Sequence, residues 1–123
     1  MGVKMKDQDI VQVCREIKKL RSELTLLEGQ HLCREVSLAI AVKLASCGVP
    51  CWYVAGEFLV NGKAISEHYW VVVDGTIYDA TADQFELTDD ILVSKEKDAR
   101  YRATHFFVVN SDSANLITKA ISN

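Results

Sequence analysis

The sequence has few of the residues that divide a chain into separate parts, with one proline and six glycines among 123 residues. It contains no internal repeat and no low-complexity segment, so nothing marks a linker. A chain of this length can bury a core and fold alone. We therefore expect one domain over residues 1–123. It would comprise an N-terminal amphipathic helix in 1–28, the core that carries the candidate site in 30–85, and a closing strand and helix in 86–123.

Three further absences limit the possible functions. The net charge is −3, so the chain offers no basic footprint for nucleic acid. No apolar run is long enough to span a bilayer, and the first residues, MGVKMKDQD, contain no signal-peptide core. The composition, 49% apolar and 25% charged, is typical of a globular protein. We expect a cytoplasmic protein that binds neither nucleic acid nor membranes.

The four cysteines do not form the pattern of a metal site. Cys47 and Cys51 are close in sequence, but a structural zinc site needs two close pairs of ligands and there is no second pair. His31 and Cys33 lack a matching downstream pair as well. The core is sufficient without disulfides, so we expect reduced thiols and no metal or cofactor. Cys14, Cys47 and Cys51 then serve as packing residues.

A first helix is predicted from a capping box formed by Asp9 and Gln12, with Gly29 as its stop. Between them apolar residues recur every three or four positions, which indicates an amphipathic helix. These residues are Ile10, Val13, Cys14, Ile17, Leu20, Leu24 and Leu27.

A second helix is predicted to start between Gln30 and Leu32 and to end at Gly48. Only Ser37 and Lys43 interrupt its apolar stretch from residue 36 to residue 45. A helix that is apolar nearly all round is buried, so we expect this one at the centre of the fold.

The second half of the chain predicts an antiparallel sheet, because aromatic and β-branched runs alternate with turn signals. Asn61-Gly62 and Asp74-Gly75 are both typical of type I′ hairpin turns. Helices followed by such a sheet indicate an α+β domain. Four strands are expected, at residues 51–60, 63–73 (with His68), 76 onward and 104–110. A short helical turn is expected at 88–90 and a closing helix at 111–122. Residues 94–102 receive no assignment.

The Asp74-Gly75 hairpin also brings two polar residues together. In the register that this turn imposes, Trp70 lies opposite Asp79, and His68 is the diagonal neighbour of Asp79 on the same face. The two Cβ atoms would be about 7 Å apart, within reach of a hydrogen bond between imidazole and carboxylate. A histidine held in this way has the tautomer that a general base needs.

Cys33 is the candidate nucleophile. In the first turn of a helix, free backbone N–H groups and the helix dipole lower the pKa of a thiol, and the same N–H groups can bind an oxyanion. Burial frequencies alone favour an inert core thiol, but the nearby His68–Asp79 pair favours a nucleophile. Gln30 could donate to the oxyanion and Trp70 could shield the pair from water. The alternatives are a polar helix cap for Gln30 and plain core packing for Trp70.

This order of residues resembles the transglutaminase-like branch of the papain-like cysteine protease superfamily. A cysteine at the start of a buried helix precedes a histidine in H-x-W by 35 residues, and an aspartate in D-x-T follows 11 residues later. The similarity covers residues 30–85. It implies a core of one helix packed on an antiparallel sheet, with Cys33 as nucleophile, His68 as base and Asp79 as the carboxylate that orients the base.

The expected function is that of a small cysteine hydrolase or acyltransferase, such as a protease, an amidase or a transglutaminase-like enzyme. It would act on an amide or ester of a protein, a peptide or a small molecule, through a thioester intermediate. The alternative is a non-catalytic module of the same fold that binds a protein or peptide, since a fold does not dictate function. The identity of the substrate, the choice between water and an amine as acceptor, and the oligomeric state stay open.

Overall fold

The computed structural model describes residues 5–24, 33–81 and 91–122, and in this part the chain is α+β, as expected. Its five strands form one antiparallel sheet in the order β4-β3-β2-β1-β5. The elements in chain order are α1 (Asp7–Leu24), α2 (Cys33–Ser46), β1 (Cys51–Val60), β2 (Lys63–Val73), β3 (Thr76–Asp79), β4 (Leu92–Lys95), β5 (Tyr101–Val109) and α3 (Ser111–Ser122).

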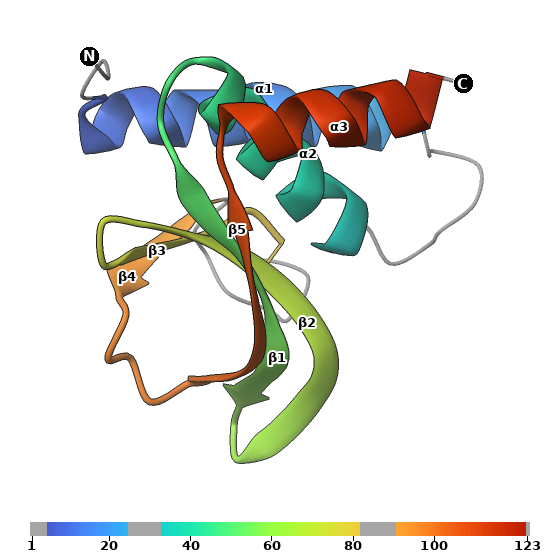
Figure 1. Ribbon diagram of the computed structural model, residues 1–123. Coiled ribbons are helices and arrows are strands. Elements are labelled where there is room, and N and C mark those ends of the chain that lie inside the picture. Colours follow the sequence, from blue (N-terminus) through green and yellow to red (C-terminus); the bar gives the residue numbers. More distant parts are fainter. Residues whose placement is uncertain (1–4, 25–32, 82–90, 123) are drawn as a thin grey trace.

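The three helices gather on one side of the molecule, and the long β1–β2 hairpin extends away from them (Figure 1). Helix α2 packs against α1, α3 and the sheet, so it is the central helix that its apolar sequence predicts. No helix in the described ranges is long and apolar enough to cross a membrane. The side chains of α2 that are almost completely buried are Val36, Ser37, Ile40, Ala41, Leu44 and Ala45.

The helix ends differ slightly from the prediction. Helix α1 begins at Asp7, two residues before the expected start, and the backbone N–H of Lys6 donates to Asp9 Oδ2 at 3.4 Å. Asp9 is therefore the third helical residue and caps the backbone N–H of Lys6, rather than being the N-cap of a capping box, and Gln12 bonds Glu16 instead. Gly29, the expected stop, lies outside the described residues.

The prediction missed strand β4 and placed the start of β5 three residues late, at 104 instead of Tyr101. Strand β4 has only four residues and pairs with β3 along one side. Its sequence, LVSK, alternates too briefly to give a strand signal. The helical turn expected at 88–90 lies outside the described residues.

Both hairpin turns have the predicted geometry. Asn61 and Gly62 have φ values of 49° and 80°, and Asp74 and Gly75 have 49° and 76°. Two consecutive residues with positive φ define the type I′ turn, which matches the twist of the flanking strands. Val73 consequently pairs with Thr76, and this register sets the positions of all residues further along β2 and β3.

The sheet is strongly curved. The hydroxyl of Tyr101 in β5 lies 2.8 Å from Asp79 Oδ2 in β3, although three strand spacings, about 14 Å, would separate these strands in a flat sheet. The helices pack on one face of the sheet, and a separate apolar cluster fills the concave face. That cluster comprises Val54, Phe58, Trp70, Val72, Ile77, Leu92 and Tyr101.

The bend depends on Gly56 in β1. The register of β1 shifts near this residue on both sides, once against β2 and once against β5. Such bulges increase the local bend of a strand. The backbone of β5 comes so close that a Cβ atom on Gly56 would lie 2.1 Å from the carbonyl oxygen of Arg102. Only glycine allows this approach.

We expect Gly56→Ala to lower the free energy of unfolding by about 1–3 kcal/mol, because the new methyl group displaces the backbone of β5. Urea denaturation followed by circular dichroism measures this change. Gly62→Asn is the matched control, since the space around Gly62 is open and asparagine tolerates positive φ. An equal loss in both variants would contradict the close approach.

Candidate active site

The predicted contact between His68 and Asp79 is confirmed. Nε2 of His68 lies 2.6 Å from Oδ2 of Asp79, and the two side chains are 1% and 0% exposed. The hairpin register brings them together, because β2 and β3 pair up to Val71 and Tyr78 and the next positions outward continue the same alternation. A hydrogen bond this short inside the protein is much stronger than one in water.

Asp79 accepts hydrogen bonds on both carboxylate oxygens. Tyr101 donates its hydroxyl to Oδ2 at 2.8 Å, and the backbone N–H of Thr81 donates to Oδ1 at 3.0 Å. Burial, followed by the negative charge of Asp79, raises the pKa of Tyr101 well above its ordinary value, so the phenol stays protonated and donates. An ionised carboxylate only accepts hydrogen bonds, so Nε2 of His68 carries a hydrogen. In neutral His68, Nδ1 is then the nitrogen that can take up a proton.

Three aromatic rings surround the imidazole of His68 on the concave face. Phe58 stacks on it at 5.1 Å between ring centroids, Trp70 lies at 5.9 Å and Tyr101 at 6.4 Å. Trp70 is 2% exposed and contacts Tyr101 edge-on, so it packs in the core and also shields the pair from water.

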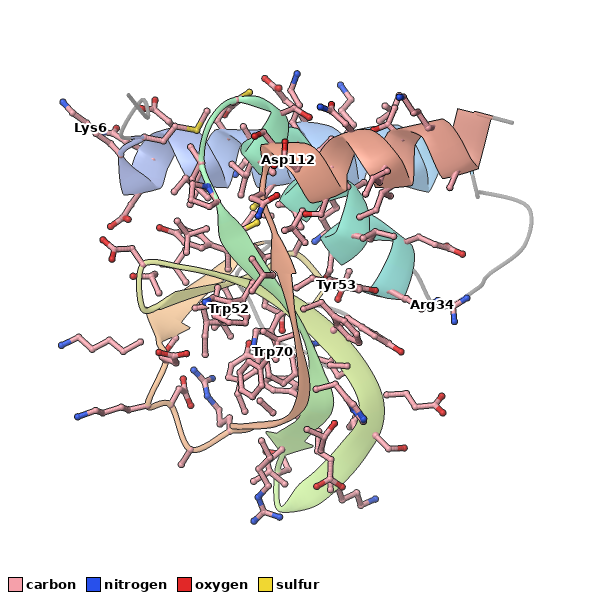
Figure 2. All side chains as sticks on the ribbon, viewed as in Figure 1. Lys6, Arg34, Trp52, Tyr53, Trp70 and Asp112 are labelled. Atoms are coloured by element: carbon pink, nitrogen blue, oxygen red, sulfur yellow. The ribbon has the colours of Figure 1, made fainter. Side chains whose placement is uncertain are left out.

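The first turns of α2 are tied to the strands beside His68. The hydroxyl of Tyr53 donates to the carbonyl of Arg34 at 3.1 Å, and Figure 2 shows Tyr53 directed toward Arg34. One turn further, the hydroxyl of Ser37 donates to the carbonyl of Tyr69, the neighbour of His68, at 3.1 Å. Cys33 is the first residue of α2.

The structure brings some of the predicted site residues together and leaves others undescribed. His68, Asp79 and Trp70 lie together on the concave face, whereas α2 packs on the opposite face of the sheet. The side chain of Cys33 and the whole of Gln30 lie outside the described residues.

The other thiols are structural. Cys14 is completely buried, and Cys51 is nearly so, with its thiol against the carbonyl of Ala41. Burial raises the pKa of each to about 12, with the charge of Asp79 adding to the effect at Cys14. Cys14, Cys51 and the half-buried Cys47 form no disulfide. In the described ranges no three His, Cys, Asp or Glu residues could hold a metal ion together.

The sequence analysis missed three residues that hold the His68–Asp79 pair: Phe58, Thr81 and Tyr101. The role of Thr81 could have been predicted from the sequence D-x-T, because an aspartate often accepts a hydrogen bond from the backbone N–H of the second residue after it. Phe58 and Tyr101 had no such sequence signal, because their contacts with the pair depend on the curvature of the sheet.

Comparisons of this chain with protein families, with curated proteins and with solved structures found no match. The interpretation of the site therefore depends on its residues and their geometry.

The buried thiols predict a loss of stability at alkaline pH. In the unfolded chain Cys14 and Cys51 ionise near their ordinary pKa of 9.0, while in the folded protein they stay protonated up to about pH 12. The free energy of unfolding should fall above pH 9, by up to about 1.4 kcal/mol per pH unit for each thiol. Urea titrations between pH 8 and pH 10 measure this slope.

The double variant Cys14→Ala, Cys51→Ala should be less stable at pH 8 but show a shallower alkaline slope than the wild type. Cys47→Ala serves as the control, because Cys47 is only half-buried and its removal should leave the slope unchanged. A slope that is identical in all three proteins would show that these thiols do not resist ionisation.

Proposed function

We propose that this protein is a small cysteine hydrolase or acyltransferase of transglutaminase-like or papain-like type, with Cys33 as nucleophile, His68 as base and Asp79 as the orienting carboxylate. The observation that carries the proposal is the 2.6 Å contact between His68 Nε2 and Asp79 Oδ2 in a water-free aromatic surrounding. Because Nε2 is bonded to Asp79, proton exchange with a nucleophile would involve the other ring nitrogen, Nδ1.

The chemistry follows from these roles. Nδ1 of His68 takes the thiol proton of Cys33, and the sulfur bonds to the carbonyl carbon of an amide or ester. The tetrahedral intermediate collapses, and the leaving amine or alcohol receives the proton from Nδ1. Water or an amine then attacks the thioester carbon and gives a proton to His68, and the sulfur leaves as a thiolate. Asp79 stabilises the imidazolium in each half of the cycle.

Two features of α2 support Cys33 as the nucleophile. Its position at the helix start exposes it to unpaired backbone N–H groups and the positive end of the helix dipole, both of which favour a thiolate. The bonds from Tyr53 to Arg34 and from Ser37 to Tyr69 fix this end of α2 against β1 and β2. A fixed geometry is what a nucleophile and its base require. We also propose the cytoplasm as the location, since such a thiol stays reduced there.

A second candidate function is a non-catalytic module of the same fold that binds a protein or peptide. One observation favours it: His68 and Asp79 have almost no exposed surface and lie on the sheet face opposite to α2. In that case the pair serves as a buried polar link between strands, and Cys33 is an ordinary thiol.

Iodoacetamide labelling of Cys33 as a function of pH distinguishes the two functions. A thiolate–imidazolium pair should make Cys33 react rapidly below about pH 7, and Asp79→Asn should slow this reaction at least tenfold at pH 6 because the imidazolium loses its partner. Mass spectrometry of peptides identifies the labelled site. Cys47 is the internal control, and Cys33→Ser shows the background.

Asp79→Asn preserves the shape of the side chain, and thermal melting followed by circular dichroism verifies that the variant is folded. Labelling of Cys33 that follows an ordinary thiol pKa of about 8.5, unchanged by Asp79→Asn, would contradict the enzyme and favour the binding module.

Tyr101→Phe tests the hydroxyl that shares Oδ2 with His68. The variant keeps the ring that packs on Phe58 and Trp70 but removes one hydrogen bond to the carboxylate. We expect the free energy of unfolding to fall by about 1–3 kcal/mol. The pH dependence of Cys33 labelling should also shift, because Asp79 loses one of the hydrogen bonds that fix it against His68. Tyr69→Phe is the control: Tyr69 stacks on Tyr53 and lies on the helix face. A pH profile identical to that of the wild type would mean that Tyr101 contributes only to stability.

A further inference from the structure

Strand β5 is an exposed sheet edge. It ends the sheet, and of the strands that the structure describes it pairs with β1 alone. Residues 102–108 are all exposed, although both ends of the strand, Tyr101 and Val109, are buried. The outer side of β5 therefore presents a row of backbone N–H and C=O groups, which is interrupted at Thr104, where the register against β1 shifts.

Large apolar side chains flank this edge on both faces of the sheet. On the concave face, Phe106 and Val108 are 53% and 52% exposed, next to Trp52, which contacts Phe106 edge-on at 6.0 Å. On the helix face, Phe107 is 50% exposed and lies between Tyr53 and His105. Figure 2 shows the neighbours Trp52 and Tyr53 directed to opposite sides of β1.

Strand β5 has one of the usual protections of a sheet edge, a bulge at Thr104 where its register against β1 shifts. Beyond the bulge, residues 105–109, HFFVV, contain no proline, glycine, lysine or acidic residue. Natural proteins use such residues to prevent pairing between sheet edges. This regular and largely apolar part of the edge is a surface for another strand.

We propose that β5 pairs antiparallel with β5 of a second copy of this chain, giving a two-fold symmetric dimer with one continuous ten-stranded sheet. A two-fold axis through Phe107 places Phe106 of each copy opposite Val108 of the other, so like faces meet and both apolar strips become continuous. A second copy thus matches apolar groups on both faces of the sheet.

The exposed area sets the expected strength of the dimer. Aromatic side chains bury 150–250 Å² each, so Trp52, Phe106 and Phe107 at about half exposure, together with Val108, would remove roughly 400 Å² per copy from water. This lies at the low end of specific interfaces, where complexes are transient. We therefore expect a reversible dimer with a Kd on the order of 100 μM.

Sedimentation velocity of the full chain between 5 and 500 μM tests the proposal. The wild type should change from monomer to dimer over this range. Phe107→Lys should be monomeric throughout, because the two-fold axis sets the two new charges opposite each other. Val93→Lys is the matched control: Val93 is 44% exposed on β4, the other edge of the sheet, and its replacement should leave the dimer unchanged.

Hydrogen exchange at low and high protein concentration locates the interface independently. Alternate backbone amides within residues 105–109 should exchange at least fivefold more slowly at 500 μM than at 5 μM, and those of β4 should not change. A wild type that stays monomeric at 500 μM would overturn the proposal and assign this edge to a strand of a different protein. A dimer that Phe107→Lys leaves intact, or that Val93→Lys also abolishes, would overturn it as well.

Discussion

The buried carboxylate of Asp79 is the interaction on which the rest of this structure depends. It has no contact with water and therefore needs donors, which it obtains from His68 in β2, Tyr101 in β5 and Thr81 just after β3. An unpaired charge at this depth would cost several kcal/mol. These donors come from three separate segments. The hydrogen bonds that they make to one carboxylate therefore fix both the curvature of the sheet and the position of the imidazole.

This arrangement explains how so small a domain can hold a polar pair in its interior. Phe58, Trp70 and Tyr101 close around the imidazole and exclude water, while Gly56 lets β1 bend enough for β5 to approach. The helices contribute on the other face, where α2 fills the core and its first two turns are bonded to Tyr53 and Tyr69.

Strand β5 takes part in two unrelated features of the molecule. Its first residue, Tyr101, faces inward and supports Asp79, and its exposed residues Phe106, Phe107 and Val108 form an apolar edge. A second copy bound along this edge would extend the sheet on the side of β5, at the far end of the strand order from β4. The proposed dimer is therefore independent of whether Cys33 is a nucleophile.

The sequence by itself determined the local features. Asp74-Gly75 sets a type I′ turn, the turn sets the register, and the register puts His68 beside Asp79, so this pair was predictable. The apolar composition of α2 likewise determined that it is central. Contacts that depend on several strands could not be predicted in this way. The reach of Tyr101 to Asp79 and the ring of Phe58 on His68 require a sheet bent at Gly56, and that bend arises only when all five strands and the concave core pack together.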